Sequence, residues 1–414
     1  MDLSLPYGSE HVSVRVRKHC HILGRTSRAS SHNAQDQIVR DAMEHPLQAP
    51  RLADAVRAGD RVAIVVSDYT RPTGADVYAP MILSQLMEAG VAAENIVIVI
   101  ALGLHRPASD QEIASILGPQ IPEQVRVENH NPDQGLVDLG GVQMNRAVAE
   151  ASLVVITGAV TFHPMAGYSG GYKSLVPGVA SRQDILHNHL LYFQGDHANP
   201  RVGPAIVERN PVIDDIRRRG QALGRTVCLN VVMDEQHRVA FAAYGSVDSA
   251  WYACASFLRH SSIIDIPKRL PVVFASAGGF PCDFSFYQSM KTLTNSALAC
   301  EPGGTLIVLS ECRNGWELRD ELIGMFSLPL KEIARQVKSD FRMDALAVYM
   351  AARVIKSRCV FLFSSLPADQ VRRAGMEPVN SPTELERIID MLPTCEIAVF
   401  PEATSFLPAW PGFS

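Results

Sequence analysis

Three short apolar runs, each followed by a polar loop, constrain the fold of this chain most strongly. They cover residues 61–66, 95–102 and 153–158, a length typical of strands buried on both faces. Helical patterns separate the runs, and strands that alternate with helices form parallel sheets with right-handed crossovers. We therefore expect an α/β protein with largely parallel sheets. In such sheets ligands bind beyond the carboxyl ends of the strands, so the loops after these runs are candidate sites.

A second α/β pattern begins after the prolines and basic residues of the segment 262–271 interrupt the first pattern. The length of 414 residues suits two large domains. We expect an N-terminal α/β domain over residues 1–266 and a C-terminal α/β domain over residues 267–414. We expect the active site in the cleft between them, with the second domain closing over the substrate.

Local patterns predict further elements. Residues 11–17 alternate with period two, which is typical of a half-exposed antiparallel strand. Ser109 and Glu112 form a capping-box pattern before a helix over 109–117. The remaining predictions are helices over 36–46, 51–58, 77–90, 285–300 and 345–355, and strands over 272–276, 305–310 and 359–363.

Composition excludes several classes of protein. Lys and Arg number 38 against 43 Asp and Glu, which argues against a nucleic-acid binder. No run approaches the roughly 18 apolar residues of a membrane helix. The N-terminus lacks the basic and apolar regions of a signal peptide, and the eight cysteines form no C-x-x-C pair. We expect a cytoplasmic protein with no membrane or nucleic-acid partner. The sequence is compatible with a homo-oligomer.

Two of the candidate loops carry charged side chains directly after a predicted strand. Asp68 and Arg71 follow the first run, and either pair with each other or grip an anionic ligand through the guanidinium. His105 follows the second run within Gly103-Leu-His-Arg-Pro107. Histidine transfers protons near neutral pH, so we expect His105 to be functional.

The third loop, residues 163–178, is the richest in reactive side chains. It contains His163, Lys173 and the pair Gly170-Gly171, whose backbone N–H groups could cradle a phosphate. Its spacing does not match a Walker A loop.

His187 and His189 follow the third loop, and no histidine follows His260. The capping pattern Ser181-Arg-Gln-Asp184 predicts a helix here, on which the two rings would diverge. We therefore expect only one of them to be functional.

In the final third, Tyr287, Gln288 and Lys291 begin a predicted helix after a Gly-Gly loop. Tyr287 and Lys291 share a face, as do Gln288 and Lys291. They form either an exposed polar face or a substrate-binding face.

Five motifs in order resemble the nickel-dependent lactate racemase family. They are Ser67-Asp-Tyr-Thr-Arg-Pro72, Gly103-Leu-His-Arg-Pro107, the segment 163–178, Asn188-His189 and Tyr287-Gln288-Ser-Met-Lys291.

The resemblance implies a racemase or epimerase that inverts the alcohol carbon of a small 2-hydroxy acid. It implies a nickel pincer nucleotide (pyridinium-3,5-bisthiocarboxylic acid mononucleotide nickel) that accepts and returns a hydride. The implied roles are acid/base catalysis for His105 and His163, cofactor attachment for Lys173, and nickel ligation for His189.

For the other motif residues, the resemblance implies contacts with small molecules. Asp68 and Arg71 would lie near the cofactor and the substrate, and Tyr287, Gln288 and Lys291 would surround the substrate carboxylate. The segment Phe341-Arg-Met-Asp-Ala345 lacks the tryptophan of some relatives, which leaves the particular 2-hydroxy acid undetermined.

Two alternatives from other classes stay open. One is a zinc-dependent hydrolase that uses His163, His187 and His189. The other is a protein that binds a nucleotide or cofactor without catalysis, and it would tolerate the loss of His105 and His163.

Overall fold

The computed structural model describes residues 1–24, 34–234, 236–394 and 396–411, and the chain divides into two compact units. The N-terminal unit comprises residues 27–194 and 198–261, and the C-terminal unit comprises residues 1–26, 195–197 and 262–413. The domains expected from the sequence differ from these units in one important respect. Residues 1–24 group with the C-terminal unit, because strand β3 (His19–Ile22) pairs with strand β21 (Glu396–Phe400).

The N-terminal unit is built on a six-stranded sheet in which only β15 runs antiparallel to its neighbour. The order across the sheet is β15 (Val239–Gly245), β14 (Thr226–Met233), β9 (Leu153–Ala159), β4 (Val62–Ser67), β5 (Ile96–Ala101) and β6 (Arg126–Asn129). The three apolar runs are thus the central strands, as predicted. The chain order reverses between β4 and β9, which places a topological switch point beside the loops that follow these two strands.

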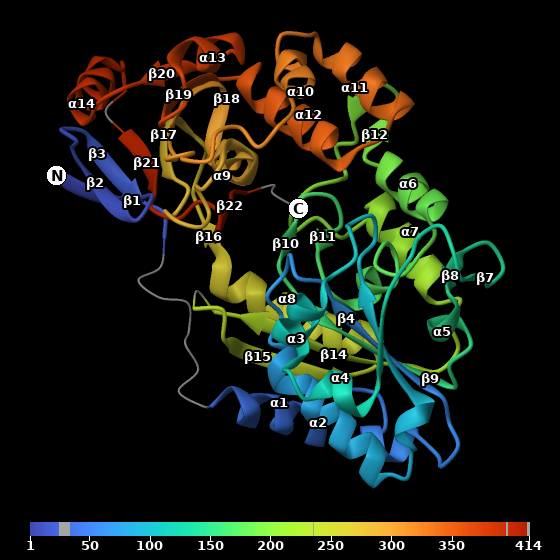
Figure 1. The fold of residues 1–414 in the computed structure, drawn as a ribbon. Helices are drawn as coiled ribbons and strands as arrows, with labels where there is room; N and C mark the ends of the chain where they lie inside the picture. The colour runs from blue at the N-terminus through green and yellow to red at the C-terminus, as the bar shows by residue number, and fades with distance from the viewer. Residues whose placement is uncertain (25–33, 235, 395, 412–414) are drawn as a thin grey trace. The chain divides into compact units, whose positions relative to one another are not determined.

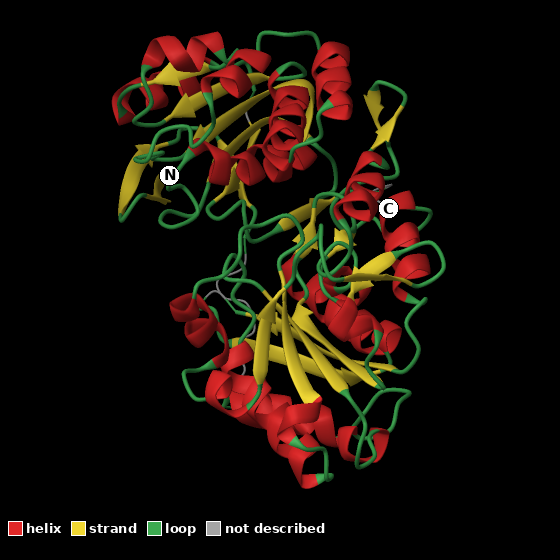
Figure 2. Cartoon of the chain, turned by 45° about the vertical axis from the view of Figure 1, so that its right-hand side comes forward, coloured by secondary structure: helices red, strands yellow, loops and turns green. Residues whose placement is uncertain are grey.

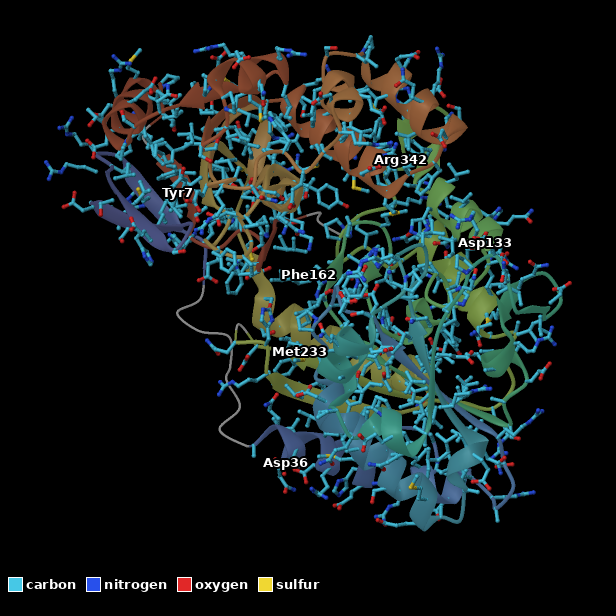
Figure 3. All side chains as sticks on the ribbon, in the orientation of Figure 1. Tyr7, Asp36, Asp133, Phe162, Met233 and Arg342 are labelled. Carbon is cyan, nitrogen blue, oxygen red and sulfur yellow. The ribbon has the colours of Figure 1, made fainter. Side chains whose placement is uncertain are left out.

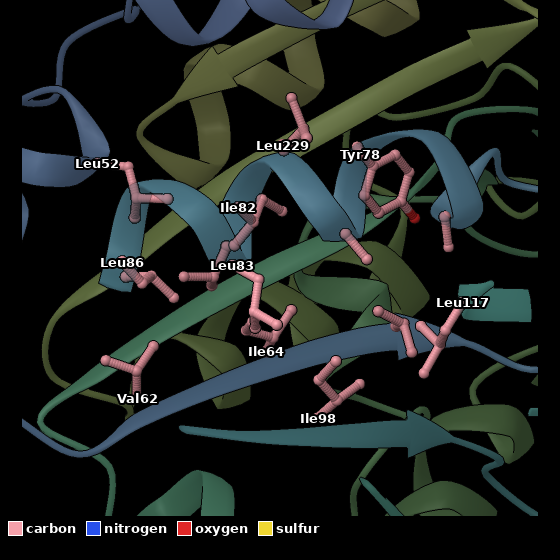
Figure 4. Close-up of a cluster of buried hydrophobic side chains, with 14 of the residues drawn as sticks. Leu52, Val62, Ile64, Tyr78, Ile82, Leu83, Leu86, Ile98, Leu117 and Leu229 are labelled. Carbon is pink, nitrogen blue, oxygen red and sulfur yellow. The ribbon is translucent and has the colours of Figure 1, made fainter. Parts of the chain in front are cut away.

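Helices enclose this sheet, as Figures 1 and 2 show for the strands and helices of the unit. The longer ones are α1 (Gln35–Glu44), α2 (Ala75–Glu88), α3 (Asp110–Leu117), α6 (Arg182–Leu190), α7 (Pro211–Gly220) and α8 (Val247–Ser262). Figure 4 shows how α2 lays Tyr78, Ile82 and Leu86 against Ile64 and Ile98 of the sheet. This buried apolar contact anchors the strands whose ends carry the candidate site.

The C-terminal unit contains a second six-stranded sheet, and all its strands are parallel. Their order is β20 (Glu377–Val379), β19 (Cys359–Phe363), β18 (Cys300–Leu309), β17 (Leu270–Ser276), β21 and β3. The helices include α9 (Phe286–Ala299), α11 (Leu330–Ser339), α12 (Met343–Ile355) and α14 (Pro382–Met391). An antiparallel hairpin of β1 (Asp2–Tyr7) and β2 (Glu10–Arg15) packs Leu3 and Leu5 into the same core.

Most local predictions are confirmed within one to a few residues. The alternating segment is strand β2, and α3 begins with the predicted capping box, in which Ser109 and Glu112 bond reciprocally. The helix expected over 51–58 is only a short 3₁₀ turn at Leu52–Ala55. Within the described residues, no helix combines the length and apolar character needed to cross a membrane.

Candidate active site

The polar loops that follow β4, β5 and β9 lie at one edge of the N-terminal sheet. These strands are parallel neighbours, and Ser67 at the end of β4 is in register with Ala101 at the end of β5. The edge therefore collects side chains from three segments that are far apart in the sequence.

Asp68 pairs with His105 across this edge. One carboxylate oxygen of Asp68 accepts a short hydrogen bond from Nδ1 of His105, and the other accepts bonds from the backbone N–H and hydroxyl of Thr70, at 3.1 and 2.6 Å. The Asp68–Arg71 ion pair that the spacing allowed is absent from the described contacts of Asp68.

The protonation of this pair follows from its contacts. Burial of Asp68, which is 3% exposed, acts to raise its pKa, but the bonds from His105 and Thr70 outweigh burial and hold the pKa below its usual value. Asp68 is thus an anion that only accepts, so Nδ1 of His105 carries a proton. The lone pair of the neutral ring then lies on Nε2. The ring is 45% exposed, so Nε2 can meet a small molecule.

His163 belongs to a short hairpin of β10 (Phe162–His163) and β11 (Gly167–Tyr168) that follows β9. Phe162, labelled in Figure 3, marks the hairpin's place in the N-terminal unit. Nδ1 of His163 accepts the backbone N–H groups of Met165 and Ala166 at 3.2 and 3.0 Å. The lone pair of this ring is therefore on Nδ1, and the proton of the neutral form is on Nε2.

Lys173 lies in the 3₁₀ turn η3 (Gly171–Ser174) directly after the hairpin. Burial and, to a smaller extent, the positive charge of Arg71 lower the pKa of its amine to about 7, while the negative charge of Asp68 acts in the opposite direction. Asp68 and Arg71 of the first loop therefore lie close enough to Lys173 of the third loop to change the pKa of its amine.

The glycine pair before Lys173 packs tightly against its neighbours. The N–H of Gly171 donates to Oδ1 of Asn230 at 2.9 Å, and a Cβ at Gly171 would lie 2.8 Å from the ring of Trp251. A Cβ at Gly170 would lie 2.7 Å from Val160. Both glycines have positive φ angles, 77° and 55°, so they allow the turn to pack tightly against β14 and α8. The N–H of Gly171 is thus occupied by Asn230, and binding of a ligand by Gly170 and Gly171 stays a prediction.

Helix α6 directs His189 into the N-terminal unit and His187 toward solvent, as the predicted helix requires. Ser181 caps this helix by accepting the N–H of Asp184. Nδ1 of His189 donates to the carbonyl of Ile185 at 2.8 Å, so its lone pair is on Nε2. Burial, helped by the charge of Lys173, lowers the pKa of His189 to about 4, and the ring is neutral at pH 7.

His163, Lys173 and His189 line one small cavity. Apolar side chains complete its wall, among them Met165 and Val212. A neutral imidazole, an amine with a lowered pKa and a second imidazole thus meet in a largely apolar site, an arrangement typical of functional sites.

A buried polar network holds α6 against α7. Nδ2 of Asn188 donates to Asp215 at 3.0 Å, and Arg219 donates to Asp215 at 2.9 Å and makes a short contact with Asp184. The network thereby joins both ends of α6, the helix that carries His189.

Tyr287, Gln288 and Lys291 belong to α9 of the C-terminal unit. Ser285 caps α9 by accepting the N–H of Gln288 at 3.3 Å. Gln288 and Lys291 are exposed and Tyr287 is half-buried. Their helical positions are as predicted, and their contacts with a substrate stay a prediction.

Sequence reasoning missed several residues that hold the site. Asn230 is a polar residue inside an apolar strand, and this contrast is a signal that could have revealed it. No local sequence pattern marks the other three residues, because tertiary packing determines their partners; they are Thr70, Asp215 and Arg219.

The three histidines of the zinc-hydrolase alternative do not form a metal site in the structure. His187 points away from His189, and among the described residues no three His, Cys, Asp or Glu side chains are grouped to hold a metal. A metal held by His189 would need its other donors from a bound molecule.

Two family models match this chain in order. One, described as the lactate racemase N-terminal domain, matches residues 7–200, and one described as the lactate racemase C-terminal domain matches residues 267–402.

Individual relatives show the same similarity. The lactate racemase of Thermoanaerobacterium thermosaccharolyticum is 31% identical over 326 residues, which cover 76% of this chain and 75% of the relative. That of Lactiplantibacillus plantarum is 26% identical over 325 residues, with the same coverage. The solved lactate racemase apoprotein from T. thermosaccharolyticum superimposes with a TM-score of 0.87 at 26% identity, covering 99% of this chain and 100% of that chain.

Proposed function

This chain belongs to the lactate racemase family, and from that membership we propose that it racemises lactate or a closely similar 2-hydroxy acid. The observation that carries the proposal is the meeting of His163, Lys173 and His189 in one cavity, beside a loop edge that holds the Asp68–His105 pair.

The residues around the cavity fit the nickel pincer nucleotide that the family resemblance implies. The lone pair on Nε2 of His189 suits nickel, which accepts imidazole together with softer donors. The amine of Lys173, with a pKa of about 7, is partly uncharged at neutral pH and can bond to a thiocarboxyl group. When bound, this cofactor supplies the acceptor for the hydride of the alcohol carbon. We propose His189 as the nickel ligand and Lys173 as the point of attachment.

The remaining residues would bind and orient the substrate. We propose that His105 and His163 form the acid/base pair at the substrate's oxygen. Arg71, whose charge reaches Lys173, would hold the carboxylate, because a guanidinium binds a carboxylate with two hydrogen bonds. We propose Tyr287, Gln288 and Lys291 as further substrate-binding residues.

The test is to load the protein with the nickel pincer nucleotide and to incubate it with single enantiomers of a panel of 2-hydroxy acids. Chiral chromatography should show inversion of lactate or a close analogue, and a Lys173→Ala, His189→Ala double variant should show none. A nickel-containing protein that inverts no member of the panel would contradict the proposal. The panel is needed because the segment Phe341–Ala345 lacks tryptophan.

A further inference from the structure

Arg106, which follows His105 in the loop after β5, joins this loop to two other segments. Its guanidinium donates to both carboxylate oxygens of Glu112 in α3, at 2.7 and 2.8 Å. It also lies over the ring of Tyr69, with Cζ 4.3 Å from the ring centroid. Tyr69 directly follows Asp68 in the loop after β4. The ring contact therefore connects the same two loops as the bond between Asp68 and His105, one residue further along each loop.

We propose that Arg106 is a positioning residue for His105. By holding the loop after β5 against Tyr69 and against α3, it keeps the imidazole of His105 on the carboxylate of Asp68. This role rests on the proposed acid/base function of His105 and adds a residue on which that function depends.

The two partners of the Asp68–His105 bond are not held equally firmly. Asp68 is 3% exposed, and its second oxygen accepts two bonds from Thr70. The ring of His105 is 45% exposed, and within the described part of the chain it makes no other hydrogen bond. The orientation of the imidazole therefore depends on the backbone of its own loop, which is the segment that Arg106 holds.

Other bonds hold this loop only at its two ends. The N–H of Gly103 donates to the carbonyl of Gly178 at 2.9 Å, and the N–H of Ala108 donates to the side chain of Asn129 at 3.0 Å. Between these two points, the side chain of Arg106 makes the contacts with α3 and with the loop after β4.

A guanidinium suits this double contact better than an ammonium group does. It is planar, so its edge binds both oxygens of a carboxylate while its face lies over an aromatic ring. Glu112 also accepts the N–H of Ser109 at 2.8 Å, which anchors the guanidinium to the capping box of α3. The bonds from Arg106, and then that from Ser109, lower the pKa of Glu112 to about 2, so this carboxylate is ionised at neutral pH.

The first test does not require turnover. The cofactor-free protein, labelled with ¹⁵N in its histidines, is measured by NMR above the ordinary histidine pKa of about 6.5, and His105→Gln assigns the signals of His105. In the wild type we expect the proton on Nδ1. In Arg106→Met we expect a mixture of the two tautomers, because the ring leaves Asp68 for part of the time. The control Arg146→Met removes an exposed ion pair with Glu150 and should leave the signals unchanged.

Two results of this test would overturn the proposal, whether or not the protein proves to be a racemase. One is a single tautomer protonated on Nδ1 in Arg106→Met, and the other is a wild-type ring of His105 that is protonated on Nε2.

The second test uses the enzyme loaded with the nickel pincer nucleotide and the 2-hydroxy acid that it inverts. We expect Arg106→Met to lower kcat about three- to tenfold, since misplacement of a catalytic group can cost up to about 10²-fold. KM should change less than about twofold, because Arg106 is not a proposed substrate contact. Tyr69→Leu should have the same effect, whereas Tyr69→Phe, which keeps the ring face, should retain the wild-type rate.

The double variant Arg106→Met, Tyr69→Leu distinguishes a shared contact from two separate effects. We expect it to be no slower than either single variant, because both substitutions remove the same contact. Losses that multiply in the double variant, or an unchanged kcat in Arg106→Met, would overturn the proposal. Circular dichroism checks that each variant is folded.

Discussion

Each imidazole of the candidate site makes a hydrogen bond that fixes which of its nitrogens carries the proton. A carboxylate orients His105, two backbone N–H groups orient His163, and a helix carbonyl orients His189. The neutral ring therefore carries its proton on Nδ1 in His105 and His189 and on Nε2 in His163, and no count of histidines in the sequence distinguishes them.

Removal of either ring next to the substrate should abolish turnover without loss of the cofactor. We expect His105→Ala and His163→Ala each to reduce racemisation by about 10²–10⁴-fold, the usual contribution of a proton-transferring or hydrogen-bonding group. Nickel content, measured by elemental analysis, should stay unchanged because neither residue is the proposed ligand. His189→Ala should lose nickel. Full activity in either of the first two variants would contradict the pair's role.

A buried histidine outside the proposed chemistry should make the protein sensitive to acid. His130 follows β6, is 2% exposed, and donates from Nε2 to the carbonyl of Ala180 at 2.9 Å. Burial lowers its pKa from 6.5 to about 4. Between these values the unfolded chain binds a proton that the native state does not, so stability falls as pH falls from 6.5 to 4. The shift corresponds to about 3 kcal/mol in the free energy of unfolding.

Urea unfolding at several pH values measures this effect on the cofactor-free protein. His130→Gln should reduce the loss of stability between pH 6.5 and 4, because an amide does not titrate in this range. The matched control His187→Gln, on the exposed face of α6, should leave the loss unchanged. An unchanged loss in His130→Gln would show that another group is responsible.

At the scale of elements, α6 depends on α7 for its position. Arg219 is almost fully buried and lies between Asp184 of α6 and Asp215 of its own helix. Ser181 caps the start of α6, and this network holds the helix, whose last turn carries His189, against α7.

Loss of the Arg219 guanidinium should therefore destabilise the N-terminal unit. We expect Arg219→Met to lower the free energy of unfolding by about 3 kcal/mol, because it removes the buried cation that Asp184 and Asp215 share and leaves only the exposed Arg218 beside Asp215. Thermal or urea unfolding measures the change. The control Arg182→Met removes an exposed ion pair between α6 and Asp133 and should cost less than about 1 kcal/mol. Similar losses in both variants would contradict a special role for the buried network.

At the scale of the whole molecule, the start of the chain completes the C-terminal unit. The β1–β2 hairpin buries Leu3, Leu5, Val14 and Val16 in that unit's core, and β3 covers the edge of β21. The strands that carry the candidate site belong to the other unit.

Deletion of residues 1–22 should selectively destabilise the C-terminal unit. The four buried side chains contribute about 1.5–3 kcal/mol each at most, so the expected loss is about 5 kcal/mol or more. Hydrogen exchange should show lost protection in β17, β18 and β21 and unchanged protection in β4, β5 and β9. Arg15→Ala, which removes only an exposed ion pair with Asp2, should leave both units unchanged. Equal loss in both units would contradict this division.

The sequence by itself determined the parallel α/β class, the central strands, the caps at Ser109 and Ser181, and the divergence of His187 and His189 on one helix. These features depend on contacts within about one helical turn or on the period of a single strand, so local residue patterns contain them. The loops at the strand ends were predictable for the same reason, since parallel strands end at one edge.

Only the tertiary structure decided how these residues are paired. Asp68 bonds to His105, 37 positions away, and not to its neighbour Arg71, because β4 and β5 lie side by side. The N–H of Gly171 is taken by Asn230 of β14, and the first strands join the last sheet. Such contacts join residues that are distant in the sequence, and the packing of the whole core determines them. The local sequence pattern around one residue therefore cannot predict its partner.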